Sequence, residues 1–263
     1  MAGLADILGT QDWERTKGGI ISPSPNSSPA SQPAERPSDH HPESKGVPDT
    51  GRYEDHINAA DKIAKNMETY FNNPWSMVED GHIWTLDEAD KLNPVKPFPP
   101  DPWLQWVTWK WQTTDLVALF KSRRMMISWL FIYLHLWMVL FLEGRSVFFV
   151  SDKEEKSDEL IDRVEFIYNH IPDDIILKPR AKRTYCHFEV PGLNNYILGV
   201  AQGARQLAQY TASALFFDEF AHWERARETF MAAKPTIDGG GKVTLVSSPK
   251  EGFFKEICFD QVR

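Results

Sequence analysis

The chain contains little cysteine and no excess of basic residues. Of its 263 residues only two are cysteines, Cys186 and Cys258, and their separation matches no metal-binding or redox motif, which fits a reducing compartment. Lysine and arginine number 29 against 37 acidic residues, for a formal charge of −8. Any nucleic-acid contact must therefore be local, or belong to another part of a larger assembly. The histidines form no HExxH-type pair of metal ligands.

Two features of the sequence bear on secretion and on membrane insertion: its first residues and one long apolar run. Residues 1–19 lack the basic start and apolar core of a signal peptide, so we expect none. Residues 125–142 read MMISWLFIYLHLWMVLFL, which reaches the nominal length of a membrane span. Basic residues precede this run, and segments typical of strands flank it. We therefore interpret it as a helix buried between a sheet and a second layer, with a membrane-anchored, non-catalytic protein as the alternative.

The amino-terminal part differs in composition from the rest. Residues 21–50 contain seven prolines and seven serines and almost no large apolar side chain. Such a segment buries too little surface to offset its chain entropy. We therefore expect residues 1–52 to be mostly disordered and residues 53–263 to form one folded domain.

Helical and strand patterns alternate after residue 53. Apolar spacing predicts helices over 55–71, 125–142, 152–170 and 223–233, and strands over 116–120, 146–150, 184–190, 195–200, 214–218 and 243–246. This alternation predicts an α/β fold, with a mainly parallel sheet covered by helices on both faces. Before the first of these strands lie four tryptophans that we expect to be mostly packed in the core: Trp103, Trp106, Trp109 and Trp111.

Two adjacent acids follow the most apolar of the predicted strands. Residues 214–217 are all apolar, as in a strand buried on both faces, and Asp218 and Glu219 come next. Acids at the carboxyl end of such a strand lie where α/β sheets bind ligands. One acid can hold magnesium while the next orients a water for attack on phosphate, the Walker B arrangement. The alternative is a strand end whose acids cap a helix.

A candidate phosphate loop lies upstream, at residues 120–128. It departs from the pattern GxxxxGK(S/T), because Met126 stands at the second glycine and Ile127 at the lysine. Lys121 and an arginine, Arg123 or Arg124, can supply the positive charge, and Ser128 keeps the hydroxyl. The alternative is a basic turn that stays solvated.

The order of these motifs resembles the large terminase subunits of tailed bacteriophages, motors that pump DNA into procapsids. The segment KSRRMMIS at 121–128 looks like the family's variant loop with the lysine in front, and FDEFA at 217–221 resembles its Walker B motif. TLVSSP at 244–249 resembles the family's coupling motif, and residues 203–206 match an arginine-containing loop. The resemblance covers about residues 100–260 and implies a P-loop NTPase fold.

The resemblance also implies roles for individual residues. Glu219 would position the attacking water, Lys121 and Arg124 would act in catalysis, and Ser128 with Asp218 would hold Mg²⁺. Arg205 would act as a finger in a neighbouring subunit, or else bind DNA phosphate or cap a strand. ATP would contact an adenine-reading Gln105, the loop residues and two coupling serines: Gln105, Lys121, Ser122, Arg123, Arg124, Met125, Met126, Ile127, Ser128, Ser247 and Ser248.

The partners that the resemblance implies are double-stranded DNA, a portal protein on the procapsid and a small terminase subunit. It implies a ring of copies in the host cytoplasm, docked transiently on the viral procapsid, and no membrane. The family's carboxyl-terminal nuclease domain is not expected in this chain, so we expect no nuclease activity. A helicase-like ATPase that remodels nucleic acid is the alternative enzyme.

Overall fold

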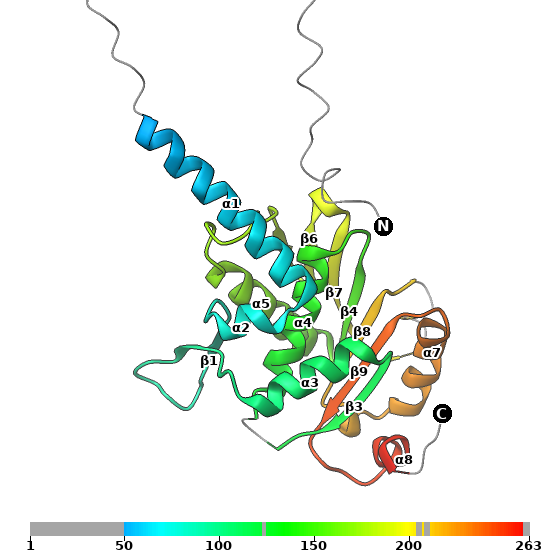
Figure 1. Cartoon of the computed structure of the whole chain (residues 1–263). Helices are drawn as coiled ribbons and strands as arrows, with labels where there is room; N and C mark the ends of the chain where they lie inside the picture. The colour runs from blue at the N-terminus through cyan, green and yellow to red at the C-terminus, as the bar shows by residue number, and fades with distance from the viewer. Residues whose placement is uncertain (1–49, 123–124, 204–206, 208–210, 260–263) are drawn as a thin grey trace, which may run out of the picture. The chain divides into compact units, whose positions relative to one another are not determined.

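The fold is built on a mainly parallel sheet. The computed structural model describes residues 50–122, 125–203, 207 and 211–259. Within these residues the main sheet has seven strands in the order β3-β9-β8-β4-β7-β6-β5, and neighbours from β3 to β7 run parallel (Figure 1). β6 and β5 are antiparallel additions at one edge. The strands are β3 (Leu116–Phe120), β4 (Ser146–Ser151), β5 (Lys182–Thr184), β6 (His187–Val190), β7 (Asn195–Ala201), β8 (Ala214–Asp218) and β9 (Lys242–Ser247).

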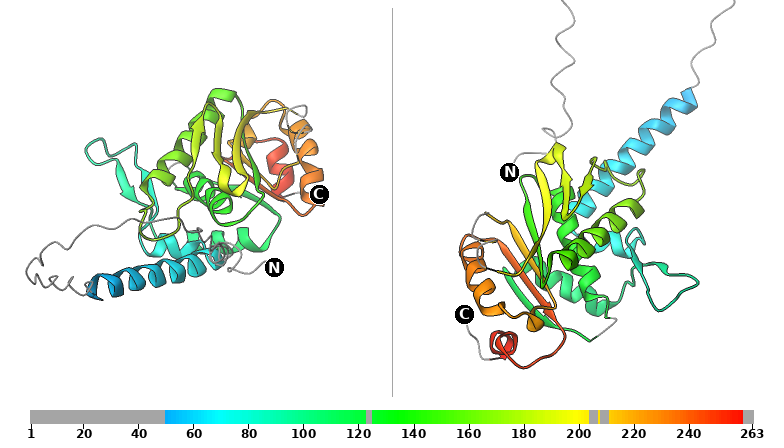
Figure 2. Two further views of the ribbon diagram at one scale, coloured as in Figure 1. Left: turned by 90° about the horizontal axis from the view of Figure 1, so that it is seen from above. Right: turned by 180° about the vertical axis from the view of Figure 1, so that it is seen from behind.

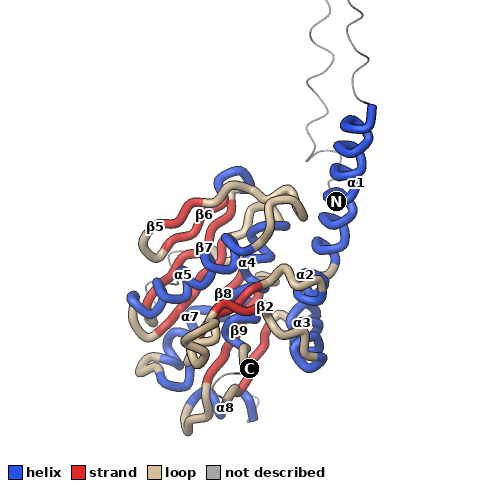
Figure 3. The backbone as a smooth tube through the Cα atoms, turned by 90° about the vertical axis from the view of Figure 1, so that its left-hand side faces the viewer, coloured by secondary structure: helices blue, strands red, loops and turns tan. Residues whose placement is uncertain are grey.

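Helices cover both faces of this sheet, as predicted. Figures 2 and 3 show helices on both sides of the strands, with α4 and α5 on one side and α7 and α8 on the other. Contacts within the chain group Asp49–Arg263 into one unit, which holds all described residues. The α-helices are α1 (Thr50–Asn72), α2 (Trp75–Glu79), α3 (Pro102–Thr113), α4 (Ile127–Phe141), α5 (Glu154–His170), α7 (Ala226–Asp238) and α8 (Phe253–Phe259).

The central strands are apolar throughout because both of their faces are buried. In β8, Phe216 belongs to the cluster under α4 and α5, whereas Leu215 and Phe217 belong to the cluster under α7 and α8. In β4, Phe149 belongs to the cluster under α4 and α5, and Phe148 belongs to the cluster under α7 and α8. An unbroken apolar run is typical of strands in such a three-layer arrangement.

The long apolar run forms the buried helix α4, which is shorter than the run itself. Within the described ranges, no helix combines the length and the apolarity needed to span a bilayer. α4 is apolar nearly all round because it packs between the sheet and the other helices on that face. One polar residue of α4, His135, has 0% exposure, and the Nδ1 of this histidine lies 2.6 Å from the carbonyl oxygen of Phe131.

His135 makes the fold sensitive to acid. Burial, its largest perturbation, lowers the pKa of His135 from 6.5 to about 4. The contribution of His135 to folding stability is therefore fully present above pH 6.5 and is lost as pH falls toward 4, by about 3 kcal/mol in all. We expect His135→Phe to flatten this part of the pH profile, measured by urea unfolding between pH 7 and 4.5. An equal slope in the His135 variant and the unaltered protein would contradict the assignment.

Four features differ from the sequence predictions or were not predicted. The expected strand 184–190 is two strands, β5 and β6, because the chain reverses at Cys186 with φ of 52°. The helix expected at 223–233 is α7, which begins at Ala226 and ends at Asp238. The hairpin of β1 (Trp84–Leu86) and β2 (Val95–Pro97) was not predicted, nor were α2, α3 and α8. The predicted disorder mainly concerns residues 1–49, which lie outside the described residues.

The prediction that the four tryptophans mostly pack in the core was wrong. Trp103, Trp106 and Trp109 are 38%, 57% and 53% exposed. Trp111 alone of the four is buried, and its Nε1 donates to Thr244 Oγ1 at 3.0 Å. The cause is helical periodicity, because α3 turns one face to the core and that face carries Trp111 together with Leu104, Val107 and Thr108.

Candidate active site

The carboxyl ends of four parallel strands meet at one edge of the sheet. Lys121 follows β3, Asp218 ends β8, Ser247 ends β9 and Ser151 ends β4. Lys121 and Glu219 are 98 positions apart, yet Lys121 Nζ lies 2.6 Å from Glu219 Oε1. The fold therefore brings the predicted phosphate loop and the predicted acids into direct contact.

Lys121 is the cation between the two acids. Its ammonium pairs with Glu219 at 2.6 Å and lies 3.9 Å from Asp218 Oδ1. The side chains of Lys121 and Asp218 are each only 14% exposed. Such limited exposure strengthens the attraction, because little water screens it.

Asp218 is held between this cation and a hydroxyl. Ser128 Oγ, in the first turn of α4, donates to Asp218 Oδ1 at 2.8 Å. Burial raises the pKa of Asp218, and Lys121 and the Ser128 hydrogen bond offset that effect only in part. A neighbouring cation would favour the ionised form of this carboxylate.

The oxygens of Asp218 and Ser128 suit a hard cation such as Mg²⁺. In the described part of the chain, no group of three or more His, Cys, Asp or Glu side chains could hold a metal. A carboxylate and a hydroxyl nevertheless fit Mg²⁺, which in nucleotide sites takes its other ligands from water and substrate phosphates.

Glu219 is fixed by a hydrogen-bond network. Its Oε2 accepts from Ser248 Oγ at 3.1 Å and from Ser248 N at 3.3 Å. His222 Nε2 lies 2.8 Å from the same Ser248 hydroxyl. Burial would raise the pKa of Glu219, but Lys121 and Ser248 together outweigh it and lower that pKa. Glu219 is therefore an ionised carboxylate at neutral pH, able to accept a proton.

In the candidate phosphate loop, Met126 adopts a backbone conformation that glycine adopts more readily than any other residue. Met126 has φ of 57° and ψ of 3°, in the left-handed region, and α4 begins at the next residue. A side chain in this region costs about 1–3 kcal/mol. At the start of the loop, Lys121 N donates to Ser247 O at 2.9 Å, and Ser122 N donates to Met125 Sδ at 3.2 Å.

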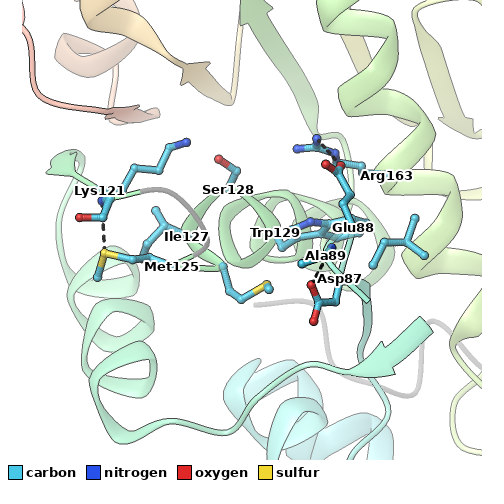
Figure 4. Close-up of a pocket in the computed structure, with 12 residues that line it drawn as sticks. Asp87, Glu88, Ala89, Lys121, Met125, Ile127, Ser128, Trp129 and Arg163 are labelled. Carbon is cyan, nitrogen blue, oxygen red and sulfur yellow. Dashed lines mark hydrogen bonds and ion pairs between the residues drawn. The ribbon is translucent and has the colours of Figure 1, made fainter. Parts of the chain in front are cut away.

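Two adjoining cavities border this network. The first, of about 340 Å³, is lined by the loop residues 121–122 and 125–128, by Trp129 and by residues 86–89 of the β1–β2 hairpin (Figure 4). The second, of about 430 Å³, is lined by Asp218, Glu219, Ser248 and the end of β4, among others. Lys121, Ser122 and Arg163 line both cavities. The site is therefore an open cleft beside Lys121, large enough for a small organic ligand.

The remaining predicted residues are placed as follows. Ser247 is buried, and its Oγ accepts from Ala221 N at 3.0 Å. Gln105 lies on α3, where its Nε2 donates to Glu79 Oε1 at 3.1 Å, and it is not among the described residues that line either cavity. Its role in reading adenine stays a prediction. Arg123, Arg124 and Arg205 lie outside the described residues.

Sequence reasoning missed three contributors to the site: His222, Arg163 and the β1–β2 hairpin. Arg163 is one of several charged residues of an amphipathic helix, so nothing in the sequence distinguished it as a residue of the site. His222 follows the acids by only a few residues, and that proximity was the available signal. The hairpin strands are only three residues long, too short for a periodic pattern.

Comparison with known proteins gives a match in structure and none in sequence. No protein-family model and no curated protein matches the chain. The crystal structure of the HK97 bacteriophage large terminase is similar, with a TM-score of 0.53 and 12% identity over 71% of this chain and 40% of that one. The large terminase ATPase domain of Thermus phage P74-26, in a mutant form, gives 0.45 and 12% over 60% of this chain and 69% of that domain.

A third similar structure is the large terminase from the thermophilic bacteriophage D6E in complex with ADP. Its TM-score is 0.41 and its identity 14%, over 52% of this chain and 35% of that protein. The matched part of the chain thus spans less than half the length of the HK97 and D6E proteins. The chain has the α/β fold of the part of the HK97 large terminase that it matches, and the predicted resemblance to phage large terminases is confirmed at the level of the fold.

Proposed function

We propose that this chain is a magnesium-dependent ATPase of the P-loop class that powers movement of viral double-stranded DNA into a procapsid, as the motor part of a terminase large subunit. The observation that carries the proposal is the contact of Lys121 with Glu219 and Asp218, and of Ser128 with Asp218, at the carboxyl edge of a parallel sheet. The fold shared with the HK97 large terminase supports the same reading.

Three residues of the network, Lys121, Ser128 and Asp218, have roles in binding the triphosphate and its metal ion. Lys121 and the free amides at the start of α4 bind phosphate oxygens. Ser128 and Asp218 are the residues that would hold Mg²⁺. When bound, the ion neutralises phosphate charge and polarises the transferred group.

Glu219 acts on the attacking water. Its ionised carboxylate orients the water and accepts its proton, while the water oxygen bonds to the γ-phosphorus and ADP leaves. Ser248, through its hydroxyl and amide, fixes the direction of the carboxylate. Because Ser248 directly follows β9, loss of the γ-phosphate would be relayed into the sheet through Ser247 and Ser248.

Substitution of Ser128 tests the magnesium site. We expect Ser128→Ala to raise the Mg²⁺ concentration needed for half-maximal ATPase activity by about 10-fold, because the hydroxyl beside Asp218 is lost. Ser128→Thr keeps the hydroxyl and should remain within about threefold of the unaltered protein. Phosphate release measured across a magnesium titration gives both values. An alanine variant with unchanged magnesium dependence would remove Ser128 from the site.

The proposed partners distinguish a packaging motor from a remodelling enzyme. They are duplex DNA, a portal on the procapsid, a small terminase subunit and further copies of the chain in a ring, in the host cytoplasm. ATPase activity that rises with duplex DNA and portal-bearing procapsids supports packaging. Activity that rises only with RNA or forked duplexes supports the helicase-like alternative.

A further inference from the structure

Arg163 of α5 lies where the two cavities adjoin. It lines both of them together with Lys121 and Ser122. Figure 4 shows Lys121 and Arg163 on opposite sides of Ser128. A ligand that extends past Ser128 therefore has a cation at each end of its path.

The Arg163 guanidinium keeps its donors available. It lies 5.4 Å from the centre of the Trp129 ring, and Nη2 is 3.9 Å from Glu88 Oε1. Glu88 is 84% exposed, so this ion pair is weak and easily exchanged. Within the described residues, no acceptor lies within hydrogen-bonding distance of the guanidinium. Trp129 thus orients the planar group while its N–H donors remain free.

The helix that carries Arg163 is fixed closely to the sheet. Ser157 Oγ donates to Val200 O at 2.6 Å, and a Cβ added at Gly199 would come within 3.0 Å of Ser157 Cβ. Neighbours of Arg163 on α5, including Leu160 and Val164, are buried. The guanidinium therefore needs little reordering to bind a ligand.

We propose that Arg163 binds the phosphate chain of the nucleotide from the side opposite Lys121, and that Glu88 holds the guanidinium until phosphate takes its place. This inference rests on the proposed function, to which it adds a second phosphate-binding cation. The planar fork of arginine matches two phosphate oxygens. Because Lys121 and Arg163 lie on opposite sides of Ser128, a phosphate chain reaches both cations, whereas a monophosphate reaches only one of them.

Binding of fluorescent ATP, ADP and AMP analogues to the full chain tests this proposal. We expect Arg163→Ala to weaken ATP binding by about 10- to 50-fold and AMP binding by less than about threefold. Arg163→Lys should recover part of the loss. Glu88→Gln should tighten ATP binding by about two- to threefold, because it releases the guanidinium; a merely structural role of Arg163 would not give this effect.

Arg227→Ala is the matched control, because Arg227 has the same kinds of contact elsewhere. Its guanidinium lies 4.2 Å from the centre of the Phe253 ring and pairs with Glu256. It should bind ATP as the unaltered protein does. If Arg163→Ala also does so while Lys121→Ala loses ATP, the inference fails and the proposed function stands. If the unaltered chain binds no ATP, both fail.

Discussion

Replacing Glu219 with glutamine should lower ATP turnover by at least about 1000-fold and leave ATP affinity within about threefold of its original value. The amide has the shape of the carboxylate and can still accept from Lys121, so the binding surface is preserved. It cannot accept a proton from water, so the chemical step fails. Single-turnover hydrolysis and equilibrium binding, measured on the same preparation, separate the two effects.

Glu251→Gln is the control for this variant, since Glu251 pairs with Lys255 on the surface. It should hydrolyse ATP at the original rate. Hydrolysis by the Glu219 variant at an unchanged rate would eliminate the proposed mechanism. A loss of ATP binding equal to the loss of turnover would instead show that Glu219 serves binding.

The Lys121→Ala substitution should have the second large effect, on both ATP affinity and the pH dependence of folding stability. We expect ATP affinity to fall by about 100-fold or more, because the ammonium is the described cation closest to the acids. Removing it also leaves Asp218 without its nearest counter-charge, and burial then raises the pKa of Asp218 further. The melting temperature should therefore fall as pH rises from 5 to 8, more steeply than in the unaltered chain.

The Lys255→Ala variant, which breaks an exposed ion pair, should change neither property. The double variant Lys121→Ala with Glu219→Gln removes one of the two acids. It should regain part of the stability lost at pH 8 without regaining ATP binding. Full ATP affinity in the Lys121 single variant would show that the phosphate chain binds elsewhere.

Much of the fold follows from local patterns in the sequence. The predicted limits of the 116–120 and 214–218 strands agree with β3 and β8. A short apolar run bounded by polar residues marks both ends of a buried strand. Apolar residues on one side of 152–170 likewise predicted a helix, which the structure has as α5. The short β1–β2 hairpin and the reversal at Cys186 depend on contacts distant in sequence, so local patterns did not predict them.

The site could be predicted in part for the same reason. Asp218, Glu219 and Lys121 lie at strand ends, and parallel strands bring their carboxyl ends together, so pattern alone placed them at one edge. The ion pair of Lys121 with Glu219 depends on β3 and β8 being separated only by β9, an order that no local pattern specifies. Arg163 enters the site because one turn of α5 faces the loop, which is a consequence of helix packing.

The conformation of Met126 has a consequence for how the proposed phosphate loop could be recognised. Its left-handed torsion angle is the property for which glycine is ordinarily selected at that position, and here a thioether side chain adopts it. A search that asks for a residue type would pass over such a chain, whereas one that asks for a backbone shape would retain it. Under the proposed function, a divergent phosphate loop is better recognised by the torsion angles of its turn than by the residue types of its motif.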